Sequence, residues 1–577
     1  MEKWVVSAKR ADFQEIGRRF GIDQVTARLI RNRNVIGEEA IEEYLNGSLL
    51  HLNSPHLLKD CDKTVSILTE KIREQKKIRI LGDYDIDGVC STYILYRGLK
   101  RCGARVDTEI PDRIRDGYGI NIHLIDLAWK DGVDTILTCD NGISAFEQVD
   151  YANRLGMTVL ITDHHEIPQV LPRARAIVNP KQKDCPYPYK GLCGGAIAYK
   201  VISCLYESMG IGQEEAQELI EFAAIATVGD VMDLTGENRI LVKEGLYRIA
   251  NTKNPGLAAL IQVNGLDPER LSAYHIGFVL GPCINACGRL DTAKRALALL
   301  LTDSKQEAMN LATELKELNE ERKEMTLKGV SQAVNMIEHS SLKNDKVLVI
   351  FLPDCHESLA GIIAGRVREQ YYRPVFVLTR GEEGIKGSGR SIEGYHMFQE
   401  MEKCGELFVK FGGHPMAAGL TMEEDKIDLL RKRLNEQTKL TEEDLVPKVK
   451  IDVPMPIDYI SERLIRELEY LEPFGKGNPK PLFAQKNLKV LEGRILGKHK
   501  NVMRMRVCSE AGRQMDAVYF GDIQAFLDYL KSKFKEAEVE KMLQGQLNRI
   551  ALMVTYYPVI HVFREQKSIQ IVIQNYQ

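Results

Sequence analysis

Short apolar runs alternate with longer amphipathic stretches along the chain from residue 71 onward, and residues 88–103 have the pattern of a helix. Strand–helix alternation of this kind is typical of a parallel sheet covered by helices on both faces. We therefore predict an α/β domain at residues 71–300. Four apolar runs are predicted to be its buried strands: 76–81, 133–138, 156–162 and 174–179.

A charged amphipathic stretch follows at residues 302–339, with Leu311, Leu315, Leu318 and Met325 at helical spacing. About 35 helical residues would span roughly 50 Å. We expect a connector helix at residues 301–343, and a helix packed on the surface of one domain is the alternative.

A second α/β pattern begins beyond this stretch. A strand at 346–353, a helix at 358–371 and a strand at 374–379 predict a second, smaller domain at residues 344–440. It contains two glycine-rich stretches, "GSGRS" (387–391) and "FGGHPMAAG" (411–419).

The two ends of the chain have different patterns of apolar and polar residues. Residues 1–70 read as a helical segment with no visible site chemistry. Residues 448–577 alternate apolar runs with turns, and five short strands in about 100 residues predict a small β-barrel such as an OB-fold. Those five runs are "LKVLEGRIL", "NVMRMRVC", "QMDAVYF", "RIALMVTYY" and "SIQIVIQ".

Composition adds limits to this picture. A chain of 577 residues is too long for one core, and 44% hydrophobic with 28% charged residues describes an ordinary soluble protein. No apolar run of 18 residues is present, so we expect no membrane span, and the first residues lack the apolar core of a signal peptide. The twelve cysteines contain no CxxC pair, which indicates reduced thiols and a cytoplasmic protein.

The charge is uneven along the chain. Residues 448–577 carry 21 Lys and Arg against 15 Asp and Glu, a balance of +6 within a net charge of −3. This favours a polyanion-binding module attached to an acidic core, and a solvated lysine-rich surface is the alternative.

Acidic residues and histidines follow the predicted strands. Each element alone could be a solvated loop, a turn or a helix cap, but together they predict a cluster, because ligands of parallel sheets sit at the carboxyl ends of the strands. Buried carboxylates without a cation repel one another and are poorly solvated. Carboxylates with one imidazole suit two Mn²⁺ or Mg²⁺ ions, which form a clamp for hydrolysing a phosphodiester. The elements are "GDYDIDG" with Asp83, Asp85 and Asp87, "CDNGIS" with Asp140, "TDHHE" with Asp163, His164 and His165, and "GDVMDL" with Asp230 and Asp233.

These four elements resemble, in this order, the motifs of the DHH phosphoesterase superfamily, and the two glycine-rich stretches resemble its DHHA1 substrate-binding domain. Three further stretches narrow the resemblance to the RecJ family of bacterial single-strand-specific exonucleases: "PDRIRDGYGIN", "GPCINACGRL" and "LEPFGKGNPKPLF". The resemblance runs from about residue 10 to the C-terminus.

The resemblance implies roles for single residues. His165 would face the scissile phosphate, Asp163 would orient the histidine pair, Asp87 is left uncertain and Asp233 is taken as structural. The residues that would act in catalysis are Asp140, as a bridging carboxylate, with His164, His165 and Asp163. The implied metal ligands are Asp83, Asp85, Asp140, His164 and Asp230.

The resemblance also implies contacts to the substrate. Arg289 would meet a terminal phosphate, and Ser388 and Arg390 would contact it from the second domain. His414 is a candidate for lining the same cleft, with a turn histidine that bonds backbone as the alternative. Arg113 and Tyr118 are candidates for touching the nucleic acid, and simple packing is an equal alternative for Tyr118.

The expected activity is therefore metal-dependent 5′→3′ hydrolysis of single-stranded DNA to mononucleotides, in DNA recombination and repair. Its polarity and DNA preference come only from the resemblance. The expected partners are single-stranded DNA, a single-strand-binding protein and a helicase, with no membrane, and the chain would be a monomer. Two alternatives remain open: a DHH phosphodiesterase for cyclic dinucleotides, very short RNA or pyrophosphate, and a non-catalytic scaffold.

Overall fold

The computed structural model describes residues 2–113, 115–117, 119–382, 384–497, 500–564 and 566–577. The described chain divides into two compact units. The larger unit contains residues 52–233 and 237–447, and the smaller unit contains residues 2–51, 234–236 and 448–577. The helical segment expected at 1–70 is thus shared between the two units.

A five-stranded, all-parallel sheet organises the first half of the larger unit, with the order β3-β2-β4-β5-β6. The four expected strands are present, and β3 is an additional edge strand. Only one side chain of β3, Val106, is fully buried, which explains why its sequence "RVDTE" lacks a strand-like apolar run. The strands are β2 (Lys77–Leu81), β3 (Arg105–Glu109), β4 (Thr135–Cys139), β5 (Thr158–Thr162) and β6 (Ala176–Val178).

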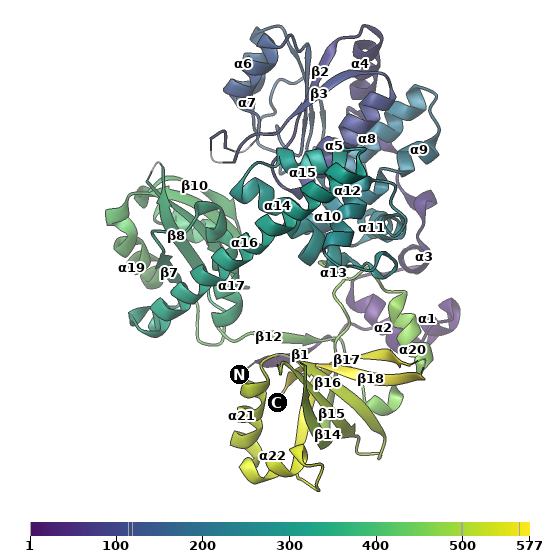
Figure 1. Ribbon diagram of the computed structural model, residues 1–577, viewed down its shortest axis with the longest axis vertical. Helices are drawn as coiled ribbons and strands as arrows, with labels where there is room; N and C mark the ends of the chain where they lie inside the picture. The colour runs from purple at the N-terminus through teal and green to yellow at the C-terminus, as the bar shows by residue number, and fades with distance from the viewer. Residues whose placement is uncertain (1, 114, 118, 383, 498–499, 565) are drawn as a thin grey trace. The chain divides into compact units, whose positions relative to one another are not determined.

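Helices cover both faces of this sheet (Figure 1). Helices α4, α5 and α8 pack on one face, and α6 and α7 bury Ile125, Val149 and Ala152 against the other. This arrangement confirms the α/β prediction. The helices are α4 (Cys61–Arg73), α5 (Ile86–Arg101), α6 (Ile122–Lys130), α7 (Phe146–Arg154) and α8 (Gly194–Ser208).

A group of further helices extends this domain and leads into α16 (Lys305–Glu338). Helix α16 has 34 residues and packs on α12, α14 and α15 before it reaches α17 (Ala360–Tyr371) of the second domain. It is therefore both a connector and a packed helix. The further helices are α9 (Gln213–Gln217), α10 (Ile220–Gly229), α11 (Gly236–Ile249), α12 (Pro255–Val263), α13 (Ala273–His275), α14 (Gly281–Leu290) and α15 (Lys294–Leu301).

The second domain of the larger unit contains a mixed sheet with the order β10-β11-β9-β8-β7, in which only β7 and β8 are parallel. Both glycine-rich stretches lie mainly on strands: "GSGRS" ends β9, and "FGGHPMAAG" spans the β10–β11 hairpin. The elements are β7 (Leu348–Phe351), β8 (Val375–Gly381), β9 (Gly384–Arg390), β10 (Phe408–His414), β11 (Ala417–Met422), α18 (Met397–Glu402) and α19 (Ile427–Gln437).

The smaller unit is built on a closed barrel. All five expected strands are present, and β14 pairs with both β15 and β17, which closes the sheet. The barrel strands are β14 (Phe483–Leu496), β15 (Val502–Cys508), β16 (Gln514–Phe520), β17 (Ala551–Phe563) and β18 (Gln566–Tyr576), with α21 (Ile523–Phe534) and α22 (Glu536–Leu543) inserted between β16 and β17.

The N-terminal segment belongs to this unit. Strand β1 pairs in parallel with β12, and Leu29 and Ile41 join the same core as Leu464 and Phe483. The elements that surround the barrel are β1 (Lys3–Val6), α1 (Phe13–Phe20), α2 (Gln24–Asn32), α3 (Glu38–Asn46), β12 (Lys448–Ile451), β13 (Val453–Pro454) and α20 (Glu462–Glu469).

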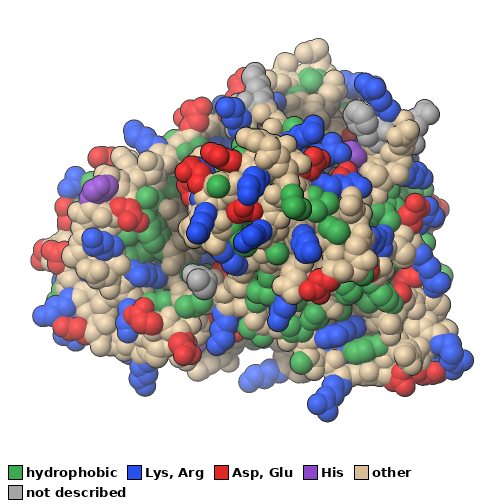
Figure 2. All heavy atoms as spheres, turned by 90° about the horizontal axis from the view of Figure 1, so that it is seen from below, with side chains coloured by type: hydrophobic (Ala, Val, Ile, Leu, Met, Phe, Trp, Pro, Cys, Tyr) green, Lys and Arg blue, Asp and Glu red, His purple; other side chains and the backbone are tan. Residues whose placement is uncertain are grey.

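Two surface properties complete the description. Within the described part of the chain, none of the helices combines the length and the apolar character that spanning a bilayer requires. On the face drawn in Figure 2, many Lys and Arg side chains are interspersed with acidic ones.

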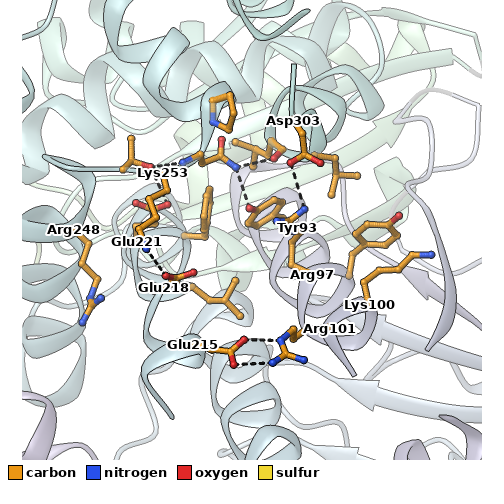
Figure 3. A pocket seen from close by; sticks show the side chains of 18 of the residues that line it. Tyr93, Arg97, Lys100, Arg101, Glu215, Glu218, Glu221, Arg248, Lys253 and Asp303 are labelled. Carbon is orange, nitrogen blue, oxygen red and sulfur yellow. Dashed lines mark hydrogen bonds and ion pairs between the residues drawn. The ribbon is translucent and has the colours of Figure 1, made fainter. Parts of the chain in front are cut away.

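A cavity of about 910 Å³ opens among α5, α10 and the loop before α12 (Figure 3). Its wall includes the buried carboxyl group of Glu221, which accepts a hydrogen bond from Thr252 Oγ1 at 3.0 Å. Burial raises the pKa of Glu221 to about 7. A group whose pKa is raised by folding stabilises the fold below its ordinary pKa, and this contribution is lost as the pH rises through the raised value.

We expect Glu221→Gln to raise the midpoint temperature of thermal unfolding at pH 8 and to change it little at pH 5. A pKa difference of this size corresponds to a change of about 3 kcal/mol in the free energy of unfolding. Glu218→Gln on the neighbouring surface, where Glu218 pairs with Lys253, is the matched control and should be neutral at both pH values. An equal gain for Glu221→Gln at pH 5 and pH 8 would contradict the assignment.

Candidate metal and phosphate site

The acidic elements meet at the carboxyl edge of the parallel sheet. Asp83 follows β2, Asp140 follows β4, and Asp163 with the two histidines follows β5. Asp85 is the N-cap of α5, where its carboxylate accepts the backbone N–H groups of Asp87 at 2.9 Å and Gly88 at 3.0 Å. An aspartate at a helix N-cap satisfies amides that the helix leaves unpaired, so one residue both starts the helix and faces the site.

Two backbone features hold these turns in place. A Cβ at Gly88 would lie 2.4 Å from the carbonyl oxygen of Asp83, so only glycine allows the strand and the helix to approach this closely. Asp140 has φ of 61°, in the left-handed region that Asp and Asn tolerate better than most residues. The Asn141 side chain donates to the carbonyls of Leu81 and Cys139 and so ties the ends of β2 and β4 together.

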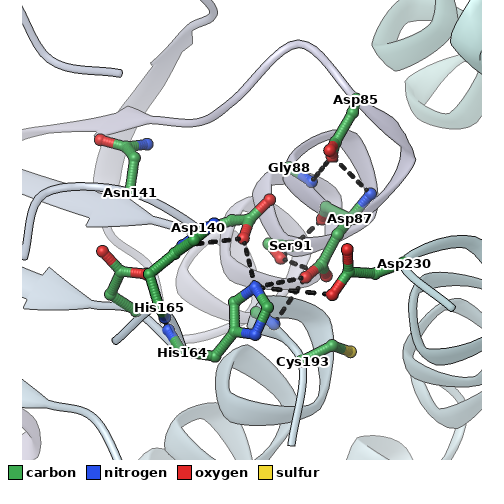
Figure 4. A network of polar contacts seen from close by, with 12 residues as sticks. Asp85, Asp87, Gly88, Ser91, Asp140, Asn141, His164, His165, Cys193 and Asp230 are labelled. Carbon is green, nitrogen blue, oxygen red and sulfur yellow. Dashed lines mark hydrogen bonds and ion pairs between the residues drawn. The ribbon is translucent and has the colours of Figure 1, made fainter. Parts of the chain in front are cut away.

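His164 is at the centre of the cluster (Figure 4). Its Nε2 lies 3.0 Å from Asp140 Oδ1, 3.6 Å from Asp87 Oδ2 and 3.6 Å from Asp230 Oδ2. Asp83, Asp85 and Asp140 form an adjoining group whose oxygens lie within 4.8 Å of one another. The structure thus brings together all five predicted metal ligands.

Asp87, whose role the sequence left uncertain, also lies in this cluster. It is fully buried, and its carboxylate accepts the N–H groups of Gly194 and Gly195, both at 2.7 Å, from the first turn of α8. A helix N-terminus favours a negative charge, and this explains why α8 can hold the Asp87 carboxylate beside His164.

Asp163 has a different surrounding. Its carboxylate accepts the backbone N–H groups of Ile143, His164 and His165 and also contacts His165 Nδ1 at 2.8 Å. Burial raises the pKa of Asp163, but the hydrogen bond and charge of His165 outweigh burial and leave this pKa below its ordinary value. The Asp163 carboxylate thus contacts both histidines of the pair, through their backbone N–H groups and the His165 ring.

His165 is half-exposed, with its Nδ1 turned to Asp163. Burial lowers the pKa of His165, but the Asp163 carboxylate outweighs burial and raises it to about 9. The Asp163 carboxylate therefore favours the protonated form of the His165 ring. This form is suited to contact a phosphate beside the acidic group.

The acidic group itself needs cations. Burial, with repulsion from neighbouring carboxylates, raises the pKa of Asp83, Asp85 and Asp140, and burial lowers the pKa of His164. Among the described residues, Asp83 Oδ1 and His164 Nδ1 are buried without a hydrogen-bond partner. A donor set of carboxylate oxygens with an imidazole fits hard divalent cations such as Mn²⁺ and Mg²⁺.

A group of polar and cationic side chains lies where the second domain meets α14, and we call Ser388, Arg390 and Arg289 the Arg390 group. A Cβ at Gly361, in the first turn of α17, would lie 2.8 Å from Arg390 Nη2 and 3.0 Å from Ser388 Oγ. Glycine at this position lets a hydroxyl and a guanidinium come close to the first turn of α17, and a helix N-terminus and a guanidinium both favour anions. Arg289 reaches across and donates to the carbonyl of Ser358 at 2.8 Å.

The remaining substrate candidates lie close to this group. Burial and then the positive charges of Arg113 and Arg322 lower the pKa of Arg289 to about 10, so these guanidinium groups lie near one another. Arg113 also stacks over the Tyr84 ring at 4.9 Å. His414, at the end of β10, lies close enough to Glu166 to contribute to lowering its pKa, and Glu166 is the neighbour of His165 in the sequence. Tyr118 lies outside the described residues.

Arg322 is a further cation near Arg289 that the sequence pattern does not single out. It lies on α16, where its neighbours in sequence give the ordinary pattern of a charged helix surface. Its side chain is partly buried and donates to Asn319 at 3.1 Å. A charged residue in an amphipathic helix carries no sequence signal that would separate it from the solvated lysines and glutamates around it.

Comparison with known proteins gives one consistent result. The DHH family N-terminal domain matches residues 77–227, the DHHA1 domain matches residues 344–440, and the RecJ OB domain matches residues 451–575. The single-stranded-DNA-specific exonuclease RecJ of Bacillus subtilis is 36% identical over 509 residues, covering 87% of this chain and 64% of that protein. RecJ of Escherichia coli is 34% identical over 570 residues, covering 95% of each chain.

Solved structures agree with these relatives. The crystal structure of RecJ in complex with Mn²⁺ from Thermus thermophilus has a TM-score of 0.82 at 27% identity and covers 100% of this chain and 79% of that chain. The corresponding complex with Mg²⁺ has a TM-score of 0.76 at 26% identity, with coverages of 100% and 78%. The fold and the site define a phosphoesterase of the DHH type. Within that class, the chain belongs to the RecJ family of single-stranded-DNA-specific exonucleases.

The crowded carboxylates make metal binding measurable through stability. We expect Mn²⁺ to raise the unfolding midpoint of the full chain and Asp83→Asn to remove most of this rise. In chelator, Asp83→Asn should itself raise the midpoint by a few degrees at pH 7.5. The gain should shrink in acid, because a carboxyl with a raised pKa destabilises the fold only as the pH rises through that pKa.

The control for this measurement is Asp184→Asn, which changes a surface carboxylate that pairs with Lys59. This variant should keep the full response to Mn²⁺. An Asp83→Asn protein with an unchanged response would rule out Asp83 as a ligand.

Proposed function

We propose that this chain is a metal-dependent 5′→3′ exonuclease that hydrolyses single-stranded DNA to mononucleotides in DNA recombination and repair. The observation that carries the proposal is the meeting of Asp83, Asp85, Asp140 and His164 at one edge of the sheet. Membership of the RecJ family and the Mn²⁺ and Mg²⁺ in the related structures support the substrate and the cofactor.

Two ions, Mn²⁺ or Mg²⁺, would be held by Asp83, Asp85, Asp140, His164 and Asp230, with Asp87 as a further candidate ligand. Bound there, the ions would supply a hydroxide from water and neutralise charge on the phosphate. The protein keeps these ligands in place through the N-cap of α5 and the first turn of α8, which hold Asp85 and Asp87.

His165 would donate its exposed N–H group to the scissile phosphate while Asp163 holds its Nδ1. A cation at this point stabilises the charge that develops on the phosphate oxygens during hydrolysis. Asp163 acts as a positioning residue, since backbone N–H groups and His165 already occupy its oxygens.

The Arg390 group would select the end of the substrate. Arg289, Ser388 and Arg390, with the N-terminus of α17, form a site for a terminal phosphate. A fixed terminal phosphate places the adjacent phosphodiester at the metals, so that one nucleotide is released in each cycle. The 5′ polarity rests on the likeness to the RecJ family.

The barrel of the smaller unit would bind the single strand beyond the catalytic domain, as the RecJ OB domain match and its positive charge support. We also propose a cytoplasmic monomer that works with a single-strand-binding protein and a helicase. The twelve cysteines are free thiols, which is compatible with a reducing compartment.

The deciding experiment is digestion of a 30-nucleotide single strand labelled at its 5′ or its 3′ end, with Mn²⁺, Mg²⁺ or excess chelator. We expect immediate release of the 5′ label as a mononucleotide, slow shortening seen from the 3′ label, and no reaction in chelator. A duplex and a dinucleotide serve as competing substrates. Preference for the dinucleotide alone, or degradation in chelator, would refute the proposal.

Asp140→Asn should lower kcat by at least about 100-fold, because it replaces a buried carboxylate of the cluster with a neutral amide of similar size. Single-turnover digestion with Mn²⁺ measures this effect. Asp184→Asn is again the control and should retain the wild-type rate. Activity that persists in Asp140→Asn would indicate a contaminating nuclease.

Arg390→Ala should reduce kcat/KM on a 5′-phosphorylated strand by roughly 10- to 100-fold, the range expected for one charge-assisted contact. Its rate on a 5′-hydroxyl strand should change much less. Arg380→Ala is the matched control, because Arg380 lies in the same sheet but pairs with Glu424 on the surface. Equal losses on both strands would argue against a terminal-phosphate site.

A further inference from the structure

A second group of metal-ligating side chains lies outside the acidic site. It joins His56 on the short helix η2 (Pro55–Leu57), Asp62 in the first turn of α4 and Cys204 near the end of α8. Cys204 is buried, whereas the side chains of His56 and Asp62 are 44% and 66% exposed. The group therefore has a buried thiol at its base and an opening to solvent.

The two distances from the thiol to the other donor atoms are close to those around a tetrahedral zinc ion. Cys204 Sγ lies 3.7 Å from His56 Nδ1 and 3.5 Å from Asp62 Oδ1. Zinc–sulfur bonds of about 2.3 Å and zinc–nitrogen or zinc–oxygen bonds of about 2.0–2.2 Å place such donors roughly 3.3–3.6 Å apart. His56 Nδ1 and Asp62 Oδ1 are 2.6 Å apart, so the exposed Asp62 side chain must move slightly outward when an ion replaces the proton between them.

A carboxylate supports the histidine from its other side. His56 Nε2 lies 3.1 Å from Glu207 Oε2, one turn after Cys204 on α8. A histidine that ligates a metal through one nitrogen usually donates its other N–H group to a carboxylate or a carbonyl, which fixes the ring and increases its basicity. This arrangement is in place here, with Nδ1 directed to Cys204 and Asp62.

The thiol is the buried donor of this group. The thiolate is the form that ligates metals, and it selects soft or borderline ions such as Zn²⁺ over Mn²⁺ and Mg²⁺. The donor set therefore differs in kind from the carboxylates of the acidic site.

We propose that His56 Nδ1, Asp62 Oδ1 and Cys204 Sγ bind one Zn²⁺ ion, with water as the fourth ligand and Glu207 as a positioning residue. The site is separate from the nuclease site and goes beyond the proposed function. Its role is structural: it fastens the start of α4 to the end of α8, two helices on the same face of the parallel sheet.

Two other states of this cluster would overturn the proposal. In the first, His56 remains a protonated bridge between Asp62 and Glu207, whose hydrogen bonds raise the pKa of His56 to about 9, and the thiol binds nothing. In the second, Cys61 and Cys204 form a disulfide, and no thiolate is available to bind a metal. The experiment distinguishes both states from a metal site.

The experiment uses the full chain carrying Asp140→Asn, purified with reductant and stripped with chelator, and titrates it with Co²⁺ as a spectroscopic probe for zinc. We expect a thiolate-to-cobalt charge-transfer band that saturates at one ion per chain and is displaced by Zn²⁺. Cys204→Ser and His56→Ala should abolish or strongly weaken the band. Cys508→Ser, which removes a partly exposed thiol in the smaller unit, is the matched control and should keep it.

Glu207→Gln should retain the band and weaken Co²⁺ binding by about 10- to 100-fold, as for other residues that orient a ligating histidine. Thermal unfolding of each metal-free variant checks that it is folded, and Zn²⁺ should raise the midpoint only where Cys204 and His56 are both present. Absence of the band in the reduced protein, or a band that persists in Cys204→Ser, would overturn the proposal.

Discussion

Repulsion among buried carboxylates is the constraint on which the larger unit depends. A parallel sheet brings the ends of β2, β4 and β5 to one edge, and the sequence places an acid at each of them. Backbone N–H groups stabilise part of this negative charge, because the first turns of α5 and α8 donate hydrogen bonds to Asp85 and Asp87. Burial and the remaining repulsion between carboxylates still raise the pKa of Asp83 and Asp140. Divalent ions would offset the free-energy cost of burying these charges. Asp85 at this edge lies close enough to Arg289 to act on its pKa, so the acidic cluster and the arginines are neighbouring groups.

Much of this fold could be predicted from the sequence because period-two and helical patterns are strong where one face is buried. The four predicted strands β2, β4, β5 and β6, the long helix and the five barrel strands all have such patterns. The failures have physical causes. Strand β3 is an edge strand with one buried side chain, and it takes its stability from pairing with β2. Residues 2–51 read as helical, but no local pattern shows that they pack on the C-terminal barrel, because their contacts are made with residues more than 400 positions away.

The site, like the fold, could be predicted only in part from the sequence. The positions of Asp83, Asp140 and His164 directly after predicted strands were enough to place them in one site, because the ends of parallel strands lie at the same edge of a sheet. It could not decide the role of Asp87, because the N–H groups that hold this residue come from Gly194 and Gly195 in a distant helix. The group around His56 carries no local signal for a related reason. Its thiol and its imidazole are 148 positions apart, and no pair of them has the spacing of a metal motif.

The smaller unit contains both ends of the chain, and this affects how the protein can be made. A ribosome releases residues 2–51 first, but their partners in the barrel emerge only after the whole larger unit has been synthesised. Until then Leu29 and Ile30 have no core to enter, and the early helices must wait as a partly exposed apolar segment. Premature termination near residue 447 would leave that segment uncovered, so a truncated product should be a target for chaperones and proteases.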